Sequence, residues 1–219
     1  MPELKKILAA LERHYGRPEL PPAKGPFELV LWENACYLLP DERRAEVFAA
    51  LRQRVGLTAE AIWKAPDAVL LELAKRGGMH PETRVMRWRE IARITMQEFA
   101  GDLDGILAMD YAKAKKGLQK FPSIGGPGAE KILMFCGMAQ GLPLESNGLR
   151  VLVRIGYGRT AKNYGATYKS VQEAVGAELP VQLASAHLLL RAHGKSLCKD
   201  AAPRCEECPI APQCIFPRI

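Results

Sequence analysis

Four cysteines near the C-terminus constrain this chain more than any other feature. Their spacing is C-x6-C-x2-C-x5-C, formed by Cys198, Cys205, Cys208 and Cys214. Thiolates on short, proline-stiffened loops are typical ligands of a metal ion or of an iron–sulfur cluster that replaces an apolar core locally. Zinc is the alternative metal, although four-cysteine zinc sites usually combine two close cysteine pairs, and only one such pair occurs here.

The composition indicates a globular protein in a reducing compartment. The chain has 219 residues, of which 48% are hydrophobic, enough for one large domain or two small ones. Its net charge of +7 suits a polyanionic partner, but many proteins without a nucleic-acid partner share such a bias. Neither a signal peptide nor a membrane-length apolar run is recognisable, so we expect a cytoplasmic monomer with no membrane partner and no disulfide framework.

The apolar residues recur with a helical period, and no segment alternates as a half-buried strand does. Leu4, Ile7, Leu8 and Leu11 predict an opening helix that ends before Gly16. A proline-rich linker and two helices separated near Pro40 follow. Further helices are expected at residues 59–75, 82–99, 103–108 and 111–120. The fold is predicted to be all-α.

A glycine-rich segment, FPSIGGPGA at residues 121–129, lies between two of these helices. Its glycines permit a tight turn, and the second helix is expected to begin near Gly126 with Pro127 in its first turn. The free N–H groups at such a helix start can bind one phosphate. A tight helix–helix connection without a ligand is the simpler interpretation of this turn taken alone.

The cysteine pattern, preceded by HGKSLC, and the glycine-rich turn closely resemble the cluster and the helix–hairpin–helix of the endonuclease III family of DNA glycosylases. This resemblance implies a two-lobed, all-α fold and a [4Fe–4S] cluster on the four cysteines. A helical barrel would comprise residues 25–140, with the hairpin at about 117–138. An iron–sulfur domain would combine residues 1–24 with 141–219. The partner would be double-stranded DNA, in the nucleoid if the protein is bacterial.

The resemblance also implies which residues contact DNA. In the hairpin these are Ile124, Gly125, Gly126, Gly128 and Lys131. In the loop between the first two cysteines, Lys199 and Arg204 are candidates for phosphate contacts, and two solvated charges are the alternative. A basic helix face, with Arg84, Arg87, Arg89 and Arg93, either approaches DNA or is simply solvated.

The hairpin departs from the family pattern L-P-G-V-G-x-K-T-A at two positions. Ser123 replaces a glycine, and Pro127 stands where bifunctional members carry the lysine that attacks the sugar. Proline has neither an amine nor a backbone N–H. We therefore expect no lyase reaction through that lysine, and Lys131, one turn later, does not replace it. The resemblance then implies a monofunctional glycosylase.

Continuing the alignment without gaps brings the family's V-D-T-H-x-x-R-V onto residues 144–151, and the catalytic aspartate onto Glu145. The resemblance implies that Glu145 stabilises an oxocarbenium-like transition state and directs the nucleophile. Glutamate adds one methylene, so Glu145 is either a working replacement or a remnant in a protein that binds without cutting. Glu145 could also merely cap the following helix, which is compatible with catalysis.

The first barrel helix carries the remaining candidates. The family's gap-filling glutamine aligns with Leu38, which we expect to act as an apolar wedge between bases. Glu33 and Tyr37 are four residues apart and, together with Asn34, are predicted to form one polar face that reads the flipped base. A structural hydrogen-bond network is the alternative for these residues. Glu33 is the second candidate for the catalytic carboxylate.

Two functions of different class are compatible with these features. The first is a DNA base-excision glycosylase that hydrolyses the N-glycosidic bond of a flipped base. The second is a non-catalytic protein that recognises distorted or abasic DNA on the same scaffold. A redox-sensing iron–sulfur protein without a nucleic-acid partner is disfavoured by the hairpin.

Overall fold

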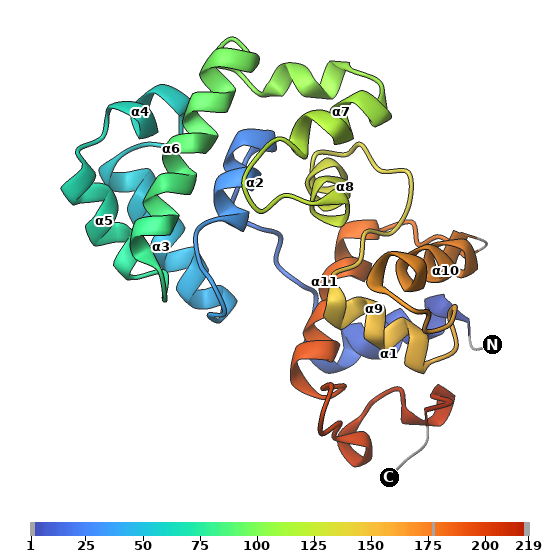
Figure 1. The fold of residues 1–219 in the computed structure, drawn as a ribbon. Helices are drawn as coiled ribbons and strands as arrows, with labels where there is room; N and C mark the ends of the chain where they lie inside the picture. Colours follow the sequence, from blue (N-terminus) through green and yellow to red (C-terminus); the bar gives the residue numbers. More distant parts are fainter. Residues whose placement is uncertain (1–2, 177, 217–219) are drawn as a thin grey trace. The chain divides into compact units, whose positions relative to one another are not determined.

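The computed structural model describes residues 3–176 and 178–216 and contains no strand among them. The fold is all-α, as the sequence predicts (Figure 1). The elements are α1 Leu4–Tyr15, α2 Gly25–Glu33, α3 Asp41–Arg54, α4 Ala59–Lys64, α5 Asp67–Lys75, α6 Pro81–Glu98, η1 Asp104–Ala108, α7 Tyr111–Leu118, α8 Gly126–Phe135, α9 Ser146–Arg154, α10 Tyr164–Gly176, α11 Leu183–Ser196, η2 Cys205–Glu207 and η3 Ala211–Gln213. None of the described helices is long and apolar enough to cross a membrane.

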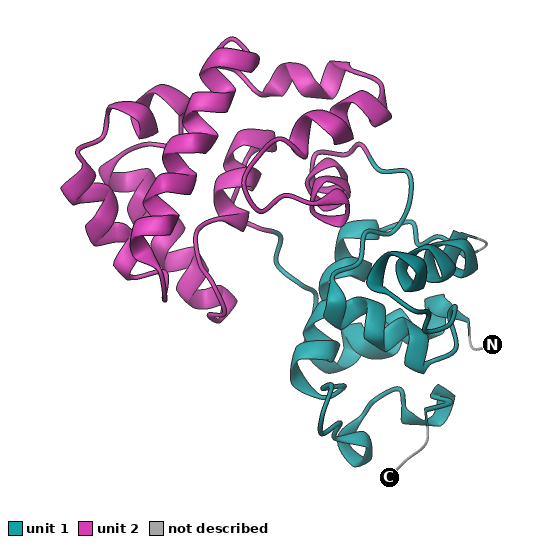
Figure 2. Cartoon of the chain, in the orientation of Figure 1, with its two compact units in different colours: residues 1–20, 139–219 teal, residues 21–138 magenta. Residues whose placement is uncertain are grey.

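The chain forms two compact units, shown in different colours in Figure 2. Unit 1 combines residues 1–20 with 139–219, and unit 2 comprises residues 21–138. Each unit has its own apolar core. The N-terminal helix α1 therefore belongs with the C-terminal half of the chain, because Leu4, Ile7 and Leu11 are fully buried in the core of unit 1.

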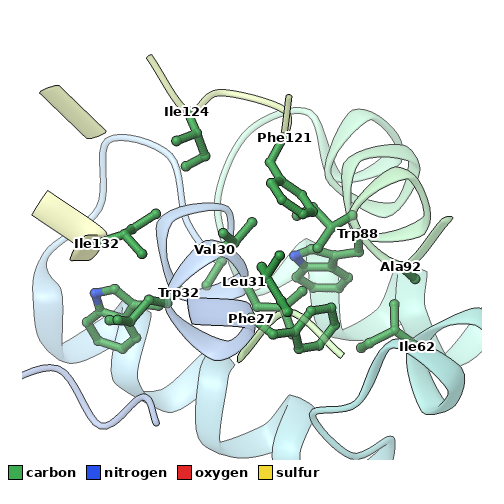
Figure 3. Close-up of a cluster of buried hydrophobic side chains, with 14 of the residues drawn as sticks. Phe27, Val30, Leu31, Trp32, Ile62, Trp88, Ala92, Phe121, Ile124 and Ile132 are labelled. Carbon is green, nitrogen blue, oxygen red and sulfur yellow. The ribbon is translucent and has the colours of Figure 1, made fainter. Parts of the chain in front are cut away.

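Unit 2 is built around α2, which is apolar on nearly all sides. Phe27, Val30, Leu31 and Trp32 are buried on different faces of this short helix, so that neighbouring helices must surround it. It contacts α3, α6, α8 and η1. Figure 3 shows these side chains gathered with the fully buried Trp88 of α6. The indole nitrogen of Trp88 donates a hydrogen bond to the Asn34 carbonyl, 3.2 Å away, which fixes the end of α2.

The region expected as a single helix at residues 59–75 is two helices, α4 and α5. The break falls at Ala65 and Pro66, because a residue that precedes proline is driven to extended backbone. Arg89 of α6 donates to the freed carbonyls of Ile62 and Ala65, at 2.7 and 2.5 Å. The segment 103–108, also expected as a helix, is the 3₁₀ turn η1.

Unit 1 is organised by α9, α10, α11 and α1. Helix α9 is strongly amphipathic: Leu149, Val151 and Leu152 are buried, while Arg150 and Arg154 lie on its other side. Helix α11 packs against both α9 and α1. At Gly194 of α11 the two backbones approach so closely that an added Cβ would lie 2.6 Å from the carbonyl oxygen of Asn147. Only glycine fits this crossing.

We expect Gly194→Ala to destabilise the fold by about 2 kcal/mol, since the clash is with backbone that cannot rotate away. The melting temperature should fall by roughly 5 °C in a chain of this size. Gly165→Ala in α10 is the matched control, because its Cβ would make an ordinary 3.6 Å contact with Asn163. Thermal unfolding followed by circular dichroism measures both. Equal melting temperatures for the two variants would contradict the close crossing.

Candidate functional site

The hairpin between α7 and α8 is held by its apolar side chains. Phe121 and Ile124 are 2% and 5% exposed and lie in the core of unit 2, where Figure 3 shows both. Because the Ile124 side chain points into the core, only its backbone is available to a ligand. Ser123, which replaces the expected glycine, adopts a left-handed backbone with φ of 63°. A serine in this conformation carries some backbone strain.

Helix α8 begins at Gly126 with Pro127 in its first turn, as predicted. Its first helical hydrogen bond runs from Ala129 N to the Gly125 carbonyl, at 2.9 Å. The N–H groups of Gly126 and Gly128 therefore have no acceptor within the helix. A Cβ on Gly125 would meet nothing within 4 Å among the described residues, so glycine here leaves room for something outside the hairpin. The geometry suits one anionic group at the helix start.

Lys131, predicted to contact DNA, is instead engaged with another candidate residue. Its ammonium lies 2.6 Å from Glu33 Oε2, and the two side chains are only 17% and 19% exposed. The pair joins α8 to the C-terminal end of α2. To reach a phosphate, Lys131 would have to break this partly buried ion pair.

The prediction that Glu33 and Tyr37 share one helix face is wrong. Helix α2 ends at Glu33, and Asn34 begins an irregular segment. All three residues nevertheless line one cavity of about 420 Å³ in unit 2, together with Ser123 of the hairpin. The sequence pattern therefore identified neighbours correctly but for the wrong reason: a turn at the helix end brings them together.

Asn34 is nearly fully buried in the wall of this cavity. Its side-chain nitrogen donates to the carbonyls of Val30 and Pro122, at 3.0 and 3.1 Å. Among the described residues its Oδ1 has no hydrogen-bond partner. An unpaired buried acceptor is costly, and a ligand that donates an N–H would satisfy it.

Leu38 directly follows Tyr37, which lines this cavity. Its side chain is 79% exposed, and its φ of 55° is unusual for a bulky residue. A strained backbone that presents a large apolar side chain to solvent is compatible with the predicted role of Leu38 as a wedge between bases.

The basic helix face of α6 is mostly structural. Arg84 is 5% exposed and donates to the carbonyls of Ala74 and Met79, at 2.7 and 3.1 Å. Arg93 pairs with Glu90 on its own helix, and Arg89 binds the end of α4. Arg87 is exposed at the cavity in unit 2.

In unit 1, Glu145 is the N-cap of α9. Its Oε1 accepts hydrogen bonds from the backbone N–H groups of Asn147 and Gly148, at 2.9 and 3.1 Å. Its Oε2 accepts from the Asn147 side chain at 2.9 Å. Arg150 in turn donates to Asn147 Oδ1 at 2.9 Å. The carboxylate is therefore held in one orientation at the positive end of a helix and remains partly exposed.

The four cysteines line one cavity in unit 1. Its other walls are mainly apolar, from Val151, Ile155, Leu197, Ile210 and Phe216, with Arg154, His193 and Arg204 as the polar exceptions. Within the described part of the chain, no three Cys, His, Asp or Glu side chains converge as ligands of a single metal ion would.

His193 belongs to the surroundings of the cysteines. Its Nδ1 is 2.9 Å from the Tyr15 hydroxyl, and its Nε2 is 3.5 Å from Cys208 Sγ. Burial lowers the pKa of His193 to about 4, so the ring is neutral at physiological pH. Burial also raises the pKa of the Cys208 and Cys214 thiols. A positively charged metal core would offset that cost and bind them as thiolates.

Lys199 and Arg204, the basic residues between the first two cysteines, are both exposed. Arg204 forms a 3.4 Å pair with Glu207, whose side chain is also exposed. Exposed pairs of this kind contribute little and exchange readily. Arg204 also lines the cysteine cavity, and its Nη2 lies 3.5 Å from the Ser196 carbonyl.

Arg154 is a residue of this site that the sequence did not single out. It donates to Cys198 Sγ at 3.4 Å and to the Lys199 carbonyl at 2.6 Å. It lies four residues after Arg150, on the same side of α9, and that spacing was the available signal.

No protein-family model matches the chain. It is 26% identical to endonuclease III of Sulfolobus acidocaldarius over 180 residues, which are 80% of this chain and 75% of the relative. It is also 26% identical to endonuclease III of Thermotoga maritima, over 88% of this chain and 84% of that protein.

Two solved structures share the fold over nearly the whole chain. A trapped endonuclease III–DNA covalent intermediate matches with a TM-score of 0.74 at 17% identity, covering 98% of this chain and 97% of that one. A thermostable thymine-DNA glycosylase matches with a TM-score of 0.75 at 16% identity, covering 97% and 95%. The chain is therefore similar in sequence to endonuclease III of two organisms and shares its fold with these two structures.

Proposed function

We propose that this protein is a monofunctional DNA glycosylase. It would hydrolyse the N-glycosidic bond of a base flipped out of double-stranded DNA and leave the sugar–phosphate strand intact. The observation that carries the proposal is Glu145, a carboxylate fixed at the start of α9 by three hydrogen bonds. Its position aligns with the family's catalytic aspartate, and the two solved structures of the same fold are a DNA-bound endonuclease III and a DNA glycosylase.

Two segments of this chain would bind the DNA backbone. The N–H groups of Gly126 and Gly128 at the start of α8 would hold one phosphate, in the open space beside Gly125. Lys199 and Arg204, both exposed, would supply cations in the other unit. These contacts position the duplex without reading its sequence.

The base would be read in the cavity of unit 2. There Asn34 Oδ1 and the Glu33 carboxylate present acceptors, and Tyr37 offers an aromatic face at the rim. Leu38 would fill the gap left in the base stack. Because Glu33 is already paired with Lys131, it is better placed to orient a base than to activate water, so Glu145 is the preferred catalytic carboxylate.

Glu145 would act by charge. As the glycosidic bond breaks, positive charge develops on the sugar, and a fixed carboxylate stabilises it and directs an attacking water. Three of the hydrogen-bonding positions on the carboxylate are used by Asn147 and Gly148, and a carboxylate offers about four. One position therefore remains for water or sugar.

The absence of a lyase step rests on residue 127. Proline at this position has no amine to form a Schiff base with the sugar. The nearest lysine on the helix, Lys131, is held by Glu33 at 2.6 Å. An ammonium in an ion pair is not a nucleophile.

The four cysteines fit a [4Fe–4S] cluster. They line one cavity whose other walls are mostly apolar. Cys198, Cys205, Cys208 and Cys214 would be its ligands. When bound, the cluster would replace an apolar core for residues 198–214 and offer one-electron chemistry.

The first prediction from this proposal is alkali-dependent base excision. Cluster-intact protein should release one lesion class from labelled duplexes that carry oxidised, alkylated, deaminated or mismatched bases. Strand breaks should appear only after alkali, because Pro127 cannot form the Schiff base. Tight binding without product from any lesion would favour the alternative, a non-catalytic protein that recognises distorted DNA. In that protein Glu145 would serve only as a helix cap. Strand cleavage without alkali would show a lyase.

The second prediction separates the two carboxylates. Glu145→Gln keeps an amide oxygen that can accept the capping hydrogen bonds but removes the charge, so the fold should be retained. Single-turnover excision should fall by about a hundredfold or more. Glu33→Gln is the matched variant and should mainly weaken or alter base preference. If Glu145→Gln cleaves at the parent rate and Glu33→Gln does not, the catalytic assignment moves to Glu33.

The third prediction concerns the cofactor. Protein purified without oxygen should be brown and contain about four irons per chain, as expected for a [4Fe–4S] cluster on four thiolates. Cys205→Ala should lose the colour and the iron, whereas Cys136→Ala in unit 2 should keep both. A colourless protein with stoichiometric zinc would contradict the assignment.

A further inference from the structure

The contacts of Arg154, the last residue of α9, are not explained by the proposed reaction. Its side chain is 10% exposed. Nη1 donates to the Lys199 carbonyl at 2.6 Å and lies 3.4 Å from Cys198 Sγ. Nη2 donates to the Asp200 carbonyl at 3.1 Å. The guanidinium carbon stacks 4.3 Å from the centre of the Phe216 ring.

This set of acceptors requires arginine. Two carbonyls and a sulfur lie in different directions, and the planar fork of a guanidinium has five donors that can reach them together. A lysine could not bind all three and stack on Phe216 as well. The side chain is thus selected for geometry as well as charge.

The charge of Arg154 is poorly compensated by protein groups. Its acidic neighbour among the described residues, Asp200, is 4.0 Å away and 89% exposed, where the attraction is weak. A nearly buried cation without a close carboxylate needs a negative group. Ligated thiolates supply that charge, and Cys198 Sγ is already within reach.

We infer that Arg154 is a positioning residue that joins the first cluster ligand to the DNA-contacting loop. The guanidinium would donate to the Cys198 thiolate, and its other bonds hold the backbone of Lys199 and Asp200. The inference rests on the proposed cluster. It assigns Arg154 two measurable effects, on the reduction potential of the cluster and on the order of the loop that carries Lys199 and Arg204.

The sign of the first effect follows from electrostatics. A cation and a hydrogen-bond donor at a ligand sulfur stabilise the reduced cluster, which is the more negative form. Removal of Arg154 should therefore lower the reduction potential. Removal should also free the 199–200 carbonyls, so the loop should exchange its amide hydrogens faster.

The experiment compares Arg154→Met, Arg154→Lys and the control Arg13→Met, an exposed arginine on α1 in the same unit. Redox titration and loss of visible absorbance in air report on the cluster, and hydrogen exchange of residues 198–204 reports on the loop. Arg154→Met should lower the potential, accelerate cluster loss by about tenfold and deprotect the loop. Arg154→Lys should recover part of the potential but not the loop protection, since it keeps the charge without the fork.

Each outcome can be assigned to one proposal. If the wild-type protein is brown and Arg154→Met matches Arg13→Met in potential, air stability and exchange, the role of Arg154 is wrong while the cluster stands. If Arg154→Met does not bind iron, Arg154→Lys is compared with the wild-type protein in reduction potential and in amide exchange of residues 198–204. If the lysine recovers the loop protection as fully as the potential, the joining role is overturned. An iron-free wild-type protein would overturn the cluster itself.

Discussion

The close crossing of α9 and α11 at Gly194 is the contact on which unit 1 depends. It brings the backbone of Asn147 against α11, where no side chain would fit. Asn147 orients Glu145, and Arg150 connects Asn147 to the Gly194 carbonyl at 2.8 Å and to the Cys198 carbonyl at 3.0 Å. One short helix therefore begins at the candidate carboxylate and, at its last residue, Arg154, contacts Cys198 Sγ.

The predicted match of Glu145 to the family's catalytic aspartate is easier to understand in this setting. A longer side chain at an N-cap can fold back onto its own helix, and Glu145 does so through both carboxylate oxygens. The extra methylene is thereby taken up in the cap instead of displacing the charge into solvent. Since a displacement of about 1 Å can cost on the order of a hundredfold in rate, this restraint matters for any catalytic role. The same cap would also serve a protein that only binds DNA, because it stabilises α9 whether or not a base is excised.

Local rules predicted much of the fold from the sequence. The helical period of Leu4, Ile7 and Leu11, the end of α1 at Gly16 and the start of α8 at Gly126 depend on neighbouring residues alone. Tertiary contacts account for what was missed. Glu33 and Tyr37 meet in one cavity because α2 ends, where apolar periodicity gave no sign of an end. Arg154 became visible only when residues 198–200 were placed beside α9, contacts 44 to 46 residues away in sequence.

The hairpin accommodates proline in the first turn of a helix without disturbing it. Proline at the first turn of α8 costs the helix nothing, because that N–H would have had no acceptor within the helix, and its fixed φ suits the position. The N–H groups of Gly126 and Gly128 on either side have no acceptor within the helix. The cation one turn later is buried against Glu33, so its charge stabilises the packing of α8 on α2 instead of facing a ligand. In the glycosylase proposed above, this helix start would hold a DNA phosphate, and it carries no lysine at position 127.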